Sequence, residues 1–235
     1  MSLMRPFEAF YRSDLQGLWG LLVVPALFVI VRPWLRERTA GADPRAASFV
    51  RAWATVFAIE TMIDPLAVVL AGAPMLPFVL LGDFRVFALW LGVMRPELPL
   101  GRTLSLAAAW TAVVPAIAWL LHRLADAALG PLPDQTLWLV YEIAFAVLAV
   151  WWATQLIPGG RPVAERFLRA TAWYVATYYA LWALADVLIL AGLDAGWALR
   201  VVPNQLYYGF WVPAVWWWVF APRYAATRTS VQTRR

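Results

Sequence analysis

Apolar segments of about 20 residues recur along the whole of this 235-residue chain, and they constrain its fold more than any other feature. About 20 apolar residues in a helix cross the ~30 Å hydrocarbon core of a bilayer. Charged residues make up only 14% of the chain, against roughly 25% in a typical soluble domain. We therefore expect an all-α polytopic membrane protein, one membrane domain over residues 1–235. Its seven transmembrane helices are expected at 15–35, 47–71, 75–94, 103–126, 135–157, 165–191 and 202–221.

The first three apolar segments resemble the last three. The run Leu-Gln-Gly-Leu-Trp opens the first segment at residues 15–19, and Asp-Gln-Thr-Leu-Trp opens the fifth at 134–138. Further pairs follow in the same order: Asp64 with Asp186, Asp83 with Asn204, and Trp90 with Trp211. This order predicts a duplication, with repeat 1 over 15–94, a linking helix at 103–126, repeat 2 over 135–221 and a tail at 222–235. A single linking helix leaves both units in the same orientation, so the repeat is parallel.

Missing residue types narrow the chemistry. The chain has no cysteine, one histidine (His122) and no lysine. Disulfides, thiolate sites, paired-histidine metal or haem sites and Schiff bases to retinal or pyridoxal are thereby excluded within one chain. We expect no cofactor and no metal, and we assign no catalytic residue.

The arginines give an orientation, because cytoplasmic loops carry an excess of basic residues. Four lie on one side of the expected spans: Arg5, Arg12, Arg123 and Arg200. Fourteen lie on the other: Arg32, Arg36, Arg38, Arg45, Arg51, Arg95, Arg102, Arg161, Arg166, Arg169, Arg223, Arg228, Arg234 and Arg235. The bias predicts an outside N-terminus and a cytoplasmic C-terminal tail in a bacterial cytoplasmic (inner) membrane. It also explains the net charge of +5 without nucleic acid as a partner.

Polar residues inside the expected spans mark a candidate site. A charge at the bilayer centre costs at least about 2.5–3.5 kcal/mol, so such residues normally face the bundle interior or water. Glu60 and Asp64 are four residues apart, share one helix face and are candidates for one shared proton. Arg85 is expected to bridge to a carboxylate on another helix, such as Glu142. The other residues expected around a substrate or in proton coupling are Asp83, Trp90, Trp182, Asp186, Asn204, Tyr208 and Trp211.

This layout resembles that of the SWEET and PQ-loop transporters, with seven helices in a parallel 3+1+3 repeat, an outside N-terminus and a cytoplasmic C-terminus. In SWEETs, asparagines on helices 3 and 7 and tryptophans on helices 2 and 6 surround a sugar. The resemblance implies such places for Asn204 and Trp182. Asp83 stands in place of the other asparagine, and Glu60 falls near the other tryptophan position. These carboxylates favour a cationic solute or proton coupling over a neutral sugar.

Three functions stay open. The first is a transporter of a small polar or cationic molecule, in which aromatic faces hold the solute and carboxylates carry protons or compensate charge. The second is an intramembrane enzyme acting on a lipid or isoprenoid, with Asp64 and Asp186, or Glu60 and Asp64, as acid and base. The third is an accessory subunit of a larger membrane complex. The expected partners are the lipid bilayer and a small-molecule substrate, and the sequence leaves the oligomeric state open, a homo-oligomer included.

Overall fold

The computed structural model describes residues 5–13, 25, 28, 44–72, 74, 76–157 and 162–220, and these residues form helices and short connections. The first expected span (15–35), apart from residues 25 and 28, and the tail (222–235) lie outside the described residues. The elements are α1 (Pro6–Tyr11), α4 (Pro44–Ala71), α5 (Leu76–Met94), α6 (Leu100–Leu129), α7 (Asp134–Trp151), η2 (Trp152–Leu156), α8 (Pro162–Leu190), α9 (Ala195–Asn204), η3 (Gln205–Phe210) and α10 (Trp211–Phe220). The segments η2 and η3 are π-helical.

Five helices in the described part of the chain are long and apolar enough to cross a membrane. They are Arg45–Val69, Leu76–Met94, Leu100–Leu129, Asp134–Leu156 and Val163–Leu190. These five correspond to the second to sixth predicted spans and begin and end within a few residues of them. The all-helical class and the apolar spans are therefore confirmed for the described residues.

The start predicted for the last helix is wrong. Helical structure begins at Ala195 rather than at residue 202, and it continues through α9, η3 and α10 to Phe220. Pro203 lies inside α9 instead of at its start. A proline ring cannot donate a backbone hydrogen bond, but membrane helices tolerate it where local adjustments satisfy the freed carbonyl. The π-helical segment η3 begins two residues after Pro203.

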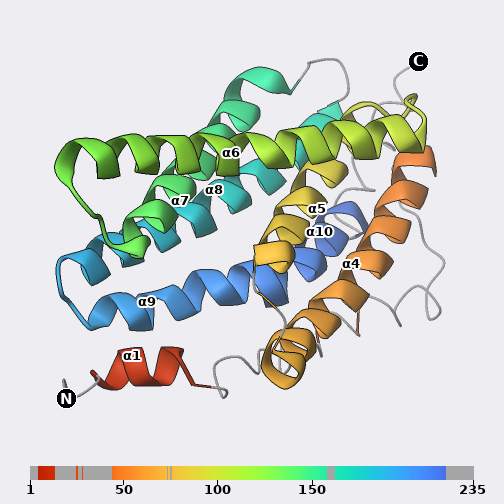
Figure 1. Cartoon of the computed structure of the whole chain (residues 1–235). Coiled ribbons are helices and arrows are strands. Elements are labelled where there is room, and N and C mark those ends of the chain that lie inside the picture. The colour runs from red at the N-terminus through yellow and green to blue at the C-terminus, as the bar shows by residue number, and fades with distance from the viewer. Residues whose placement is uncertain are drawn as a thin grey trace.

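The bundle is arranged around α5 and α8. Helix α8 packs against α5, α7, α9 and α10, while α4 packs against α5 and α10 (Figure 1). Among the five spans, α5 is the most buried and α6 the least. Helix α6 contacts α5 and α7 and exposes large apolar side chains such as Ile117, Trp119 and Leu124. An outward apolar face of this kind fits lipid as the surrounding solvent.

The short helix α1 lies along α9 at the end of the bundle where α8 turns into α9 (Figure 1). Gly192, in that turn, has a φ of 77°, a left-handed conformation that glycine adopts without steric cost. The turn ends α8 sharply and places Asp194 in front of the first residues of α1. The N-terminal segment is thus held against the last helical stretch of the described chain.

Candidate functional site

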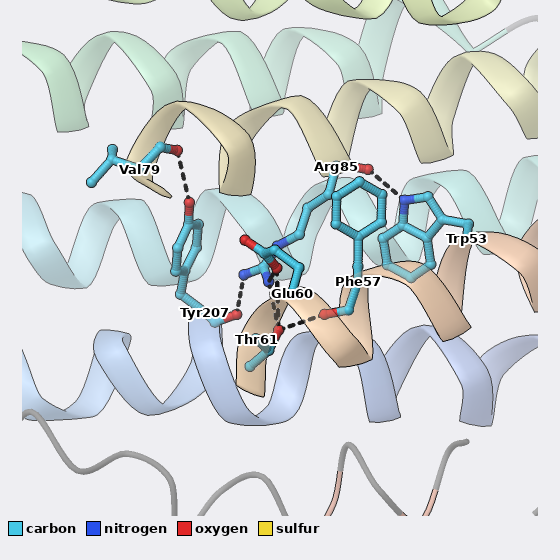
Figure 2. A network of polar contacts seen from close by, with 7 residues as sticks. All are labelled: Trp53, Phe57, Glu60, Thr61, Val79, Arg85 and Tyr207. Carbon is cyan, nitrogen blue, oxygen red and sulfur yellow. Dashed lines mark hydrogen bonds and ion pairs between the residues drawn. The ribbon is translucent and has the colours of Figure 1, made fainter. Parts of the chain in front are cut away.

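Arg85 on α5 forms the centre of a buried polar group that joins α4, α5 and η3 (Figure 2). Its side chain is 0% exposed. Its Nη1 lies 3.3 Å from Glu60 Oε2 and donates a hydrogen bond of 3.1 Å to Thr61 Oγ1. Its Nη2 donates to the backbone carbonyl of Tyr207, and the guanidinium lies 4.5 Å from the centre of the Tyr207 ring. Arg85 therefore bridges to a carboxylate on another helix, as expected, but this carboxylate is Glu60 and not Glu142, which pairs with Arg200.

Two features bring α5 this close to its neighbours. Gly82 lies against Tyr207, and a Cβ atom at residue 82 would overlap the tyrosine hydroxyl. That hydroxyl donates a hydrogen bond of 3.1 Å to the carbonyl of Val79, one turn earlier on α5 (Figure 2). On the other side, the Trp53 indole N–H donates a hydrogen bond of 2.8 Å to the Arg85 carbonyl. The close contact between α5 and η3 thus requires glycine at position 82.

Tyr207 belongs to a π-helical segment, in which backbone hydrogen bonds run to the fifth residue along the chain. The altered spacing leaves room for backbone carbonyls to accept hydrogen bonds from outside the helix. Arg85 uses the carbonyl of Tyr207 in this way. Single π-helical turns are frequently found at functional sites, and this one forms one wall of the Arg85 group.

Asp64 is buried, and no described side chain pairs with its charge. Its side chain lies one helical turn after Glu60 on α4 and its residue is 2% exposed. Neither of its carboxylate oxygens has a hydrogen-bond partner among the described residues. The nearby Arg85 guanidinium is directed to Glu60, Thr61 and Tyr207 instead. The structure thus brings Glu60 and Asp64 together on one buried face but gives an arginine only to Glu60.

Asp83 links α5 to α7 and α8. It is 0% exposed and accepts hydrogen bonds from the hydroxyls of Tyr141 on α7 and Tyr179 on α8. Each of the two Asp83 oxygens thus has a tyrosine hydroxyl as its hydrogen-bond partner. Asp83 is therefore a buried carboxylate surrounded by tyrosine hydroxyls, with no direct ion pair among the described residues.

A second ion-pair group is centred on Arg200 of α9. Its Nη2 lies 3.0 Å from Glu142 Oε1 on α7, and its Nη1 lies 3.2 Å from Asp186 Oδ1 on α8. Its side chain is 12% exposed. A last helix that begins at residue 202, as expected from the sequence, would leave Arg200 in a loop before it. A helix starting before Arg200 places it one turn from Asn204, on the same face, and that spacing is the signal that could have found it.

Asn204 connects this second group to α1. The Trp182 indole N–H donates a hydrogen bond of 2.8 Å to Asn204 Oδ1, and Asn204 Nδ2 donates one of 3.3 Å to the Tyr11 hydroxyl. The Arg200 guanidinium lies 5.7 Å from the Tyr11 ring centre. Tyr11, which is not among the expected site residues, therefore lies against both Arg200 and Asn204.

The remaining aromatic candidates lie in the packed core. Trp90 contacts Trp152 with ring centres 4.9 Å apart and donates a hydrogen bond of 3.1 Å to Thr171. Trp211 stacks on Tyr174 at 5.4 Å. Tyr208, also buried, packs edge-on against Tyr207 with ring centres 4.6 Å apart. Trp90 and Trp211 are 1% and 0% exposed, so both belong to the packed core of the described bundle.

The described part of the bundle buries more carboxylates than guanidinium groups. Its buried carboxylates are Glu60, Asp64, Asp83, Glu142 and Asp186. The arginines that face them are Arg85 and Arg200. Among the described residues, no group of three or more His, Cys, Asp or Glu side chains is arranged to hold a metal ion. Comparisons with protein-family models, curated proteins and solved structures found no match to this chain.

Proposed function

We propose that the protein is a transporter of a small polar or cationic molecule and that its buried carboxylates take up and release protons during transport. The excess of buried carboxylates over arginines is the observation that carries this proposal. Arg85 pairs with Glu60, and Arg200 is shared by Glu142 and Asp186, so Asp64 and Asp83 have no basic partner in the described bundle. The remaining negative charge has to be met by protons, by a cation or by water.

The energetic reason is the cost of an isolated charge in an apolar interior. An unpaired buried carboxylate loses its hydration, and such a group normally takes up a proton or finds a counter-ion. Asp64 is the clearest case, because neither oxygen has a described partner and the guanidinium next to it is committed to Glu60. A proton or a solute cation that binds at Asp64 removes this cost, and its departure restores it. That difference is what a carrier needs in order to couple two species.

The two ion-pair groups lie on two different sets of helices, which could form the two sides of a solute site between them. Glu60, Asp64 and Arg85 join α4, α5 and η3, whereas Glu142, Asp186 and Arg200 join α7, α8 and α9. Asp83 stands on α5 and is bonded to tyrosines of α7 and α8. Relative movement of α4 and α5 against α7 to α9 would exchange the partners of these carboxylates. We propose this exchange as the alternating step.

The proposal keeps the architecture expected from the sequence: seven spans in two parallel three-helix repeats, as in SWEET-like transporters, in a bacterial cytoplasmic membrane with the N-terminus outside. The continuous stretch α9–η3–α10 supports a last span. The basic residues support the orientation. The starts of α4, α6 and α8 and the end of α5 form one end of the bundle, which carries Arg45, Arg51, Arg95, Arg102, Arg166 and Arg169.

The paired-aspartate form of the enzyme hypothesis has less support. Asp186 is paired with Arg200, while Asp64 lies beside Glu60, so the two aspartates belong to separate groups. An acid–base pair has to reach one substrate from both sides within hydrogen-bond distance.

Proteoliposomes that enclose a pH-sensitive dye test the proposal. Sugars, amino acids and organic cations are added in turn, and solute uptake and internal pH are recorded together. We expect one solute class to move protons with wild-type protein, Asp64→Asn to abolish this coupling, and Glu97→Gln, at an exposed loop position, to leave it unchanged. Solute uptake that moves no protons and is insensitive to Asp64→Asn would falsify proton coupling through this residue. Absence of uptake across the panel would favour the enzyme or the accessory subunit.

A further inference from the structure

A basic pocket lies at the end of the bundle where α4 begins, α5 ends and α6 begins, and no buried carboxylate lines it. Figure 1 shows the start of α4 beside the start of α6. The walls of the pocket include Arg45 and Phe49 of α4, Gly92 of α5, Arg95 and Leu98 of the connection, and Leu100 of α6. Two arginines from two different segments therefore line one hollow together with apolar residues.

The shape of the pocket depends on Gly92. A Cβ atom at residue 92 would overlap the Phe49 ring, so the missing side chain lets Phe49 lie directly against α5. Arg45 stands one turn before Phe49 on the same face of α4, which directs both side chains to the same hollow. Arg95 is the first residue after α5 and reaches the pocket from the other side. The lining thus combines two arginines with apolar residues.

The ends of three apolar spans indicate where the pocket lies relative to the membrane. One span starts at Arg45, a second ends at Met94, next to Arg95, and a third starts at Leu100. The pocket therefore lies where hydrocarbon gives way to headgroups. Leu100 is 61% exposed and Leu104, one turn further along α6, is 37% exposed, so both offer apolar surface just inside this boundary.

We propose that this pocket binds the phosphate of an anionic lipid headgroup. Arg45 and Arg95 bind the phosphate oxygens, and the acyl chains run along Leu100 and Leu104 of α6. Guanidinium groups suit phosphate because their N–H groups form a fork that matches two oxygens. Basic pockets between transmembrane helices are known to bind anionic headgroups. The adjacent acidic residue, Glu97, is exposed and is not among the residues that line the pocket.

Native mass spectrometry of the full chain, released from detergent with defined lipids, tests the proposal. The probes are phosphatidylglycerol and phosphatidylcholine with identical acyl chains. We expect wild-type protein to retain phosphatidylglycerol preferentially. Each of Arg45→Gln and Arg95→Gln should weaken that binding about fivefold, since one arginine near a membrane surface contributes about 1 kcal/mol to anionic-lipid binding. The matched control is Arg102→Gln, an exposed α6 arginine outside the pocket, which should bind as wild type does.

Three results would overturn the proposal. Equal retention of the two lipids by the wild type shows that charge does not select the lipid, and this comparison needs no variant to fold. An equal loss in Arg102→Gln and Arg95→Gln shows that general surface charge, rather than the pocket, attracts the lipid. Displacement of phosphatidylglycerol by millimolar inorganic phosphate or glycerol phosphate shows a site for a soluble phosphate instead.

Discussion

The Asp194 carboxylate accepts a hydrogen bond of 3.0 Å from the backbone N–H of Phe7, although 187 positions separate the two residues in the chain. A second hydrogen bond, of 3.1 Å, comes from the N–H of Glu8. The first N–H groups of a helix have no partner within the helix, so one carboxylate from the α8–α9 turn completes the start of α1. This contact positions Tyr11 over Arg200 and Asn204.

Replacing Asp194 by alanine should release α1 from the bundle. Loss of a side chain that caps a helix start costs about 0.5–2 kcal/mol. Hydrogen exchange of the amides at residues 7–11 should accelerate, and that of the α8 amides should not. The control Asp126→Ala removes the carboxylate that binds the Leu132 N–H at 2.7 Å, at the α6–α7 connection, and should leave α1 protected. Equal protection of α1 in Asp194→Ala and wild type would show that Phe7 and Glu8 do not depend on this carboxylate.

The buried pair of Glu60 and Arg85 should show strong coupling. Arg85→Met leaves Glu60 charged and unpaired in the interior, and removal of one partner of such a pair costs about 3–5 kcal/mol. Replacing both residues removes the uncompensated charge, so the double variant Glu60→Met with Arg85→Met should lose less free energy of unfolding than the two single variants together. Equilibrium unfolding in mixed micelles gives the three values. Simple additivity would contradict a direct interaction between the two side chains.

The contact of Gly82 with Tyr207 makes a size-dependent prediction. Gly82→Ala places a methyl group where the tyrosine hydroxyl lies, and overpacking of this kind costs about 1–3 kcal/mol. Tyr207→Phe removes the hydroxyl and, combined with Gly82→Ala, should restore part of the lost thermal stability. Gly101→Ala is the matched control, because nothing lies within 4 Å of a Cβ at that position. A melting temperature unchanged by Gly82→Ala would mean that η3 can move away from α5 at no cost.

Arg200 should behave as a buried residue and Arg123 as a surface residue, although the sequence alone assigned both to the same side of the membrane. Arg200→Met leaves Glu142 and Asp186 without their common partner and should cost about 3–5 kcal/mol of unfolding free energy. Arg123 lies on α6 and forms no ion pair among the described residues, so Arg123→Met should change stability by less than about 0.5 kcal/mol. Thermal unfolding of the two variants in the same detergent compares them. Similar melting temperatures would contradict the pairing seen around Arg200.

The spans α4 to α8 could be predicted because length and apolarity alone decide them, whatever their neighbours are. The start of the last helix could not, since Pro203 is a common signal for a helix start and only its surroundings show that the helix continues past it. Arg200 was assigned to a loop as a direct consequence.

The partners within the site were harder to predict than its members. Helical spacing shows that Glu60 and Asp64 share a face, but not which helix lies opposite that face. Arg85 pairs with Glu60 rather than with Glu142 because α4 and η3 pack against α5 at this position. Tyr11 carried no signal of its own, because its role depends on Asp194 holding α1 in place.

The π-helical segment η3 also bears on how this site tolerates change in chain length. One residue added to or removed from an α-helix rotates everything beyond it by about 100°. A π-helical turn absorbs one additional residue locally, so the helices on either side keep their faces. Segment η3 can take up such a residue between Asn204 and Trp211. Asn204 is fixed by its hydrogen bond with Trp182, and Trp211 by stacking on Tyr174. The Tyr207 carbonyl, which accepts the hydrogen bond from Arg85, thus lies in the π-helical turn between Asn204 and Trp211. This turn, and not the regular α-helical repeat, sets the spacing between those two residues.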